Sequence, residues 1–115
     1  MITLPNPVVF YLARGGQEGT LSVSRIFQGQ VLWQVQAHQG AITALAWSPD
    51  GLLLASGGDD GRIHLWQAAT GARLCSCEQG ERVERMRWSA HRLLAATSGN
   101  LIRIWPVGPA QAIAA

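Results

Sequence analysis

Short apolar runs alternate with turn-forming residues along most of the chain. In the middle of the chain, four such runs have the length and composition of single strands: 42–47 (ITALAW), 52–56 (LLLAS), 62–66 (RIHLW) and 72–78 (ARLCSCE). Three segments between them carry the proline, glycine and aspartate residues of tight turns: 48–51 (SPDG), 56–61 (SGGDDG) and 68–71 (AATG). The pattern predicts four short antiparallel strands that form one sheet.

The same arrangement recurs about every forty residues. A shift of 42 residues places 10–19 (FYLARGGQEG) on 52–61 (LLLASGGDDG). A shift of 41 places 83–97 (VERMRWSAHRLLAAT) on 42–56 (ITALAWSPDGLLLAS). Repetition at this period is typical of solenoids and propellers, so we interpret the chain as copies of one structural unit.

Near its end the repeat becomes shorter. The segment 101–105 (LIRIW) matches RIHLW at a shift of only 39, so two residues are missing, and we expect them to be those matching Asp59 and Asp60. Three copies are expected: a first and incomplete one at 1–37, a complete one at 38–79 and a degenerate one at 80–115.

The middle copy, HQGAITALAWSPDGLLLASGGDDGRIHLW, resembles the WD repeat, the blade of WD40-type β-propellers. The closing Trp-Asp of that family is Trp66-Gln67 here, and Trp105-Pro106 in the third copy. The resemblance implies an all-β fold, a partial β-propeller of about three four-stranded antiparallel blades. Because propellers have at least about four blades, such an array does not close as a single chain.

Two arrangements would complete such an array. Either the chain is a fragment of a longer propeller, which we favour, or copies associate as a homo-oligomer to form a ring. In both cases we expect an apolar face at each end of the array, where a neighbouring blade is missing.

The resemblance also implies a hydrogen-bonded tetrad in the middle copy, formed by His38, Ser56, Asp60 and Trp66. The chemistry is consistent, because the indole N–H and the serine hydroxyl donate while an imidazole bridges to a carboxylate. The outer copies keep only parts of it. In the third, Gln79 takes the histidine position and Thr97 the serine position.

Other polar residues suggest no catalytic, cofactor or metal site. The Asp59-Asp60 pair could be a metal site, a catalytic pair or a turn fastener, but it lacks the alternating oxygen ligands of a calcium loop. His64 is expected between blades or at the surface, and His91 in a solvated turn. Cys75 and Cys77 would lie on one strand face, a poor arrangement for a mutual disulfide, so free thiols in a reducing cytoplasm are expected.

Composition limits the partners. A chain of 115 residues with 48% hydrophobic and 14% charged residues forms about one folded domain. A net charge of +2 is too small to indicate nucleic acid or an anionic membrane as the partner. No apolar run has the length of a bilayer span, and the first residues do not resemble a secretory signal.

By resemblance, we expect a non-catalytic scaffold or regulatory module that binds other proteins or the missing blades. The expected contact rim lies at the end of the blades that carries the fourth-to-first loops and the second-to-third turns. Its candidate residues are Gln17, Ala41, Thr43, Asp59, Arg82 and Glu84. Two alternatives are the C-terminal sensor segment of a multidomain signalling kinase or protease, and a remnant without function.

Overall fold

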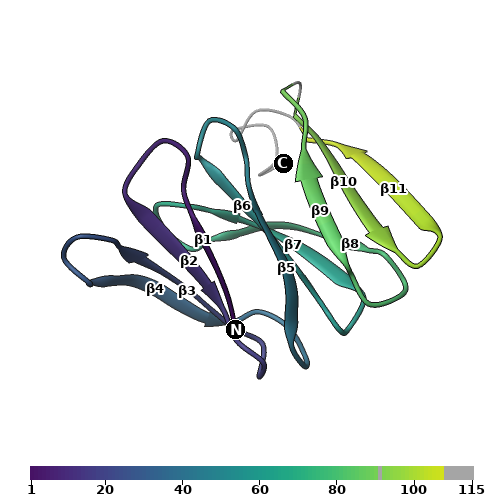
Figure 1. Ribbon diagram of the computed structural model, residues 1–115, viewed down its shortest axis with the longest axis horizontal. Helices are drawn as coiled ribbons and strands as arrows, with labels where there is room; N and C mark the ends of the chain where they lie inside the picture. Colours follow the sequence, from purple (N-terminus) through teal and green to yellow (C-terminus); the bar gives the residue numbers. More distant parts are fainter. Residues whose placement is uncertain (91, 108–115) are drawn as a thin grey trace.

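The computed structural model describes residues 1–90 and 92–107, so the expectation for His91 lies outside the described residues. The described part contains eleven strands in three antiparallel sheets that stand side by side (Figure 1). The first sheet contains β1 (Ile2–Pro5), β2 (Tyr11–Gly15), β3 (Thr20–Arg25) and β4 (Val31–Gln36). The second contains β5 (Ile42–Trp47), β6 (Leu53–Gly58), β7 (Arg62–Gln67) and β8 (Arg73–Glu78). The third contains β9 (Arg85–Trp88), β10 (Leu93–Ser98) and β11 (Leu101–Pro106).

The predicted all-β, open array of blades is confirmed. Each sheet is a meander in which consecutive strands are neighbours, and the sheets do not close into a ring (Figure 1). In the third sheet the described residues form three strands, and the expected fourth falls on residues 108–115, outside the described part. The described residues include no helix that is long and apolar enough to cross a membrane.

Neighbouring blades pack face to face, with the first strand of each blade against its predecessor. Strand β5 lies against β1 and β2, and β9 lies against β5 and β6. This packing creates two cores, one at each junction. The first includes Leu21, Val23, Leu54 and Trp66, and the second includes Leu53, Leu65, Val83 and Leu94. The middle blade is therefore buried on both faces, and all six residues of β6 are buried.

A repeated tryptophan hydrogen bond fixes one blade to the next. Trp47 Nε1 donates to the carbonyl oxygen of Leu4 at 2.9 Å, and Trp88 Nε1 donates to that of Ala46 at 3.1 Å. Both bonds run from the end of one first strand to the first strand of the preceding blade. The indole N–H groups thus find partners inside the packed junctions, which explains why these two tryptophans recur.

The strand register of the third blade corrects one sequence prediction. In the middle blade Ser56 pairs with Leu45, and the corresponding pair in the third blade is Ala96 with Met86. Ala96, and not Thr97, therefore occupies the serine position. The prediction for Thr97 is wrong because the β9–β10 turn is one residue shorter than the β5–β6 turn. After this turn the shift of 41 residues no longer relates the two copies.

The missing residues are divided between two turns rather than confined to one. In the β9–β10 turn, Arg92 adopts a φ of 61° and takes the left-handed place that Gly51 holds with a φ of 76° in the middle blade. The following hairpin between β10 and β11 has only Gly99 and Asn100 between its strands. The expectation that both missing residues match the aspartate pair is therefore corrected, since only one is lost there.

Candidate functional site

The four residues of the expected tetrad lie in one continuous hydrogen-bonded chain. His38 precedes β5, Ser56 lies in β6, Asp60 in the β6–β7 turn and Trp66 in β7. Trp66 Nε1 lies 2.9 Å from Ser56 Oγ, and His38 Nε2 lies 2.8 Å from the same oxygen. On the other side of the ring, His38 Nδ1 lies 3.0 Å from Asp60 Oδ1. The structure thus brings together residues from four separate segments of the blade.

The chemistry of the end groups sets the direction of this chain. An indole N–H can only donate and an ionised carboxylate can only accept. Trp66 therefore donates to Ser56, the Ser56 hydroxyl donates to His38 Nε2, and His38 Nδ1–H donates to Asp60. Burial tends to raise the pKa of Asp60, but hydrogen bonds from the Arg62 backbone N–H, from His38 and from the Gln39 N–H lower it below its usual value.

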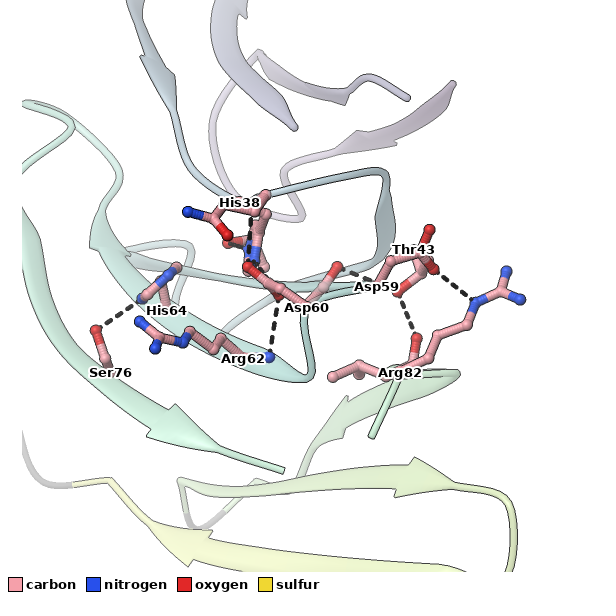
Figure 2. Close-up of polar contacts among 12 residues, drawn as sticks. His38, Thr43, Asp59, Asp60, Arg62, His64, Ser76 and Arg82 are labelled. Atoms are coloured by element: carbon pink, nitrogen blue, oxygen red, sulfur yellow. Dashed lines mark hydrogen bonds and ion pairs between the residues drawn. The ribbon is translucent and has the colours of Figure 1, made fainter. Parts of the chain in front are cut away.

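This arrangement has the connectivity of a Ser-His-Asp triad but not its accessibility. Ser56 is completely buried, and its oxygen already accepts the Trp66 N–H, so a substrate carbonyl cannot approach it. Asp60 instead joins two loops, because its carboxylate also accepts the backbone N–H groups of Gln39 and Arg62 at 3.1 Å each (Figure 2). The geometry is that of a structural fastener.

His64 was expected between blades or at the surface, and its burial excludes the surface position. Its side chain is only 4% exposed, and its ring centroid lies 4.8 Å from that of His38. Nδ1 lies 2.7 Å from Ser76 Oγ (Figure 2). Burial lowers the pKa of His64 to about 4, and the neighbouring His38 ring adds to the effect. The pattern that could have indicated this burial is the hairpin pairing of His64 with Ser56, which places both side chains on one face of the sheet.

Most of the expected rim residues meet where the second and third blades join. The Arg82 guanidinium lies 3.0 Å from Asp59 Oδ1, and the Thr43 hydroxyl donates to the carbonyl oxygen of Val83 (Figure 2). The backbone N–H of Asp59 also donates to the carbonyl oxygen of Ala41 at 2.9 Å. These contacts hold the loop before β9 against the β6–β7 turn.

The other two rim residues lie in different surroundings. Glu84 Oε1 accepts the Gly99 backbone N–H at 2.6 Å and so belongs to the third blade. Gln17 is exposed in the turn between β2 and β3 of the first blade. The structure thus places five rim candidates on the second and third blades and one on the first.

The third blade has no counterpart of the full hydrogen-bonded chain in the described residues. Gln79, at the histidine position, is 1% exposed, and its Nε2 donates to the Ala96 carbonyl oxygen over 3.4 Å. Its Oε1 has no hydrogen-bond partner within the described part of the chain. An alanine at the serine position leaves that oxygen without a hydroxyl donor, which makes this a weakly satisfied buried polar group.

Cys75 and Cys77 lie on the face of β8 that adjoins the core between the second and third blades. They pair across the sheet with Leu65 and Ile63 and are free thiols. A hydrogen bond between them lowers the pKa of Cys77 to about 7 and raises that of Cys75. Residues 1–90 and 92–107 contain no group of three or more His, Cys, Asp or Glu side chains placed to hold a metal ion.

Antiparallel meanders packed face to face, two of them four-stranded, with a hydrogen-bonded chain of indole, serine, imidazole and carboxylate groups in the middle one, define blades of a β-propeller. The family described as the anaphase-promoting complex subunit 4 WD40 domain matches residues 11–91. The chain belongs to this WD40 family.

Individual relatives agree with this assignment. The chain is 30% identical over 102 residues to the small ribosomal subunit protein RACK1y of Oryza sativa subsp. japonica, a match that covers 88% of this chain and 30% of the relative. It is 35% identical over 101 residues to the WD repeat-containing protein slp1 of Schizosaccharomyces pombe, covering 82% of this chain and 21% of the relative. The chain therefore spans less than a third of the length of these relatives.

Two solved structures are similar in fold. A chain in the crystal structure of the mitotic checkpoint complex aligns with a TM-score of 0.77 and 31% identity, over 86% of this chain and 32% of that one. The computationally designed Ika4 protein aligns with a TM-score of 0.78 and 29% identity, over 86% of this chain and 61% of that one. Both resemblances extend over nearly all of the three blades.

Proposed function

We propose that the chain is a non-catalytic protein-binding module of WD units, with units at 1–37, 38–79 and 80–115, that uses its rim to contact a partner. The observation that carries this proposal is the polar cluster at the junction of the second and third blades. Asp59 and Arg82 remain 46% and 69% exposed although they are 3.0 Å apart. Backbone bonds beneath them fix their position, which gives a partner a rigid, charged contact site.

The relatives support a role in assemblies. RACK1y is named as a protein of the small ribosomal subunit, and a similar chain is part of the mitotic checkpoint complex. The absence of catalysis in the proposal rests on Ser56, whose oxygen is buried and bonded to Trp66. The unpaired thiols Cys75 and Cys77 favour a reducing compartment such as the cytoplasm.

Completion of the array belongs to the same proposal. Three blades leave an open face at each end, and we propose that segments of other chains, or further segments of a longer one that need not be blades, cover these faces in the functional assembly. We favour coverage by other segments over self-association of identical chains because both end faces carry arginines, Arg14 on the first blade and Arg85 and Arg87 on the third.

Site-specific photo-crosslinking in cells tests the rim. A photo-reactive amino acid at Gln17 should give a discrete protein adduct, whereas one at Thr70, in the β7–β8 turn at the other end of the blades, should not. Asp59→Ala/Arg82→Ala should remove the adduct without unfolding the chain, because exposed pairs contribute little to stability. Equal labelling from both positions, or an adduct that survives the double substitution, would contradict the proposal.

A further inference from the structure

Each of the first two blades presents two rows of cross-strand neighbours to the blade that follows it. In the first blade the rows are Leu4, Ala13, Val23 and Ile2, Gly15, Leu21. In the second they are Ala46, Ala55, Leu65 and Ala44, Gly57, Ile63. These residues are apolar throughout, and each set includes a glycine on the second strand.

The corresponding rows of the third blade have a different chemistry. They are Arg87, Ala95, Ile104 and Arg85, Thr97, Ile102. Arginines replace the apolar residues of the first strand, and both are exposed. Ile102 and Ile104 on β11 are 65% and 59% exposed. The face is therefore divided into a basic strip on β9 and an apolar strip on β11.

The glycine position explains why a blade of the usual kind does not fit on this face. A Cβ added to Gly15 would lie 2.7 Å from Ile42 Cγ2 of the next blade, and one added to Gly57 would lie 2.7 Å from Val83 Cγ1. A following blade thus places a β-branched residue directly on a bare glycine. In the third blade this position is Thr97, whose own Cβ occupies that space, and a blade on top would also bury two arginine charges at high cost.

A second copy of this chain is also a poor occupant. The open face of the first blade carries mostly polar residues: Thr3, Pro5, Leu12, Arg14, Ser22 and Ser24. A head-to-tail contact would place the face that carries Arg14 against the face that carries Arg85 and Arg87, so like charges would oppose each other. The expectation of apolar faces at both ends is thus corrected, since the first blade's face is polar and the third's is apolar only in part.

We propose that the open face of the third blade docks an acidic amphipathic segment of another protein. Carboxylates of this segment would pair with Arg85 and Arg87, which have no ion-pair partner among the described residues, and its apolar side chains would cover Ile102 and Ile104. Arginine forks bind carboxylates in a bidentate manner, and such pairs give an interface its specificity. This proposal rests on the proposed function in one respect, that the chain binds other proteins. The residues of this face are not residues of the rim.

The spacing of the face favours a helical segment. Arg85 and Arg87 are two residues apart on one strand, about 6.6 Å, and the isoleucines lie two strand spacings away, about 9.6 Å. Glutamates at positions i and i+4 of a helix are about 6 Å apart, and a helix is about 10 Å wide. One edge of a helix can therefore face β9 while its apolar stripe faces β11.

The test uses the full chain and a fluorescent helical peptide with glutamates at i and i+4 along one edge and leucines along the adjacent stripe. Anisotropy should show binding that weakens with salt and weakens at least tenfold for the same peptide with glutamines. Arg85→Glu/Arg87→Glu should weaken binding at least tenfold. Arg103→Glu is the matched control, because Arg103 lies on β11 between the isoleucines but on its opposite face, and it should leave affinity unchanged.

Several results would overturn the proposal. These are absent binding, equal binding of the glutamine peptide, or equal loss in the Arg103→Glu control. A dimer in light scattering that dissociates on Arg85→Glu/Arg87→Glu would assign the face to a second copy instead. Thermal melts of each variant establish that it is folded. Asp59→Ala/Arg82→Ala should still bind the peptide, so failure of the rim proposal and failure of this one are distinguishable.

Discussion

Val83, at the start of the third blade, lies directly on the backbone of Gly57 in the second. A Cβ at position 57 would be 2.7 Å from Val83 Cγ1 and 2.8 Å from Val83 Cβ. Ile42 has the same relationship to Gly15 at the preceding junction. Each junction therefore depends on the absence of a side chain at one position of the second strand.

Gly57→Ala should accordingly destabilise the protein by about 1–3 kcal/mol through overpacking. Gly16→Ala is the matched control, because a Cβ there meets only the Thr20 carbonyl oxygen, at an ordinary 3.6 Å. Denaturant unfolding measures both. The double variant Gly57→Ala/Val83→Ala should lose less free energy of unfolding than the two single variants lose together. Strict additivity of the two losses would show that the two residues do not contact each other.

Trp66→Ala should destabilise the chain more than Trp105→Ala. Trp66 is buried and stacked on Trp33 with centroids 6.0 Å apart, so its loss costs about 3–5 kcal/mol. Its removal also leaves Ser56 without a donor, which adds about 1–3 kcal/mol. Trp105 is only partly buried and is not part of such a chain among residues 1–90 and 92–107.

Trp66→Phe separates these two contributions. It keeps an aromatic ring at the junction but removes the N–H. Its free energy of unfolding in urea should therefore lie between those of the wild type and Trp66→Ala. Equal losses for Trp66→Ala and Trp105→Ala would mean that the hydrogen-bonded chain contributes nothing to stability.

Stability should fall as the pH drops from about 6.5 toward 4. The pKa of His64 is about 4 in the folded chain against 6.5 in the unfolded one, so between these values the unfolded state binds the extra proton. The stabilisation is complete above pH 6.5 and is lost at up to about 1.4 kcal/mol per pH unit below it. The lowered pKa of Asp60 acts in the same direction, but below its usual value of 3.8.

His64→Gln should flatten this part of the profile, because glutamine keeps polar atoms near Ser76 but does not titrate. Chemical denaturation at half-unit steps between pH 4 and 7.5 measures the slope. An unchanged slope in the variant would place the titration on another group.

Cys77 should be alkylated by iodoacetamide with a half-maximal rate near pH 7, since its hydrogen bond from Cys75 lowers its pKa to about 7. Cys75→Ala removes the donor and should move the midpoint up toward the ordinary cysteine value, whereas Cys75→Ser keeps a donor and should move it less. Mass spectrometry of the modified peptide reports the rate at this one thiol. Identical midpoints in the alanine and serine variants would exclude the hydrogen bond as the cause.

Much of the fold could be predicted from local patterns. The repeat period and the strands of the middle blade follow from the spacing of apolar and turn-forming residues along the chain. The resemblance to the WD repeat implied the tetrad of His38, Ser56, Asp60 and Trp66, and the strand lengths and turn types of the middle blade are consistent with it. These features depend on short-range geometry, which a single sequence carries directly.

Only the tertiary structure decided what depends on contacts between strands and between blades. A residue lost from a turn moved the serine position from Thr97 to Ala96, since strand pairing and not sequence spacing sets the register. The burial of His64 results from the approach of His38, which comes from a loop outside its sheet. Arg85 and Arg87 could be recognised as an exposed basic strip only when their rows were compared with those of the preceding blades, because burial is a property of the packed array and not of one strand.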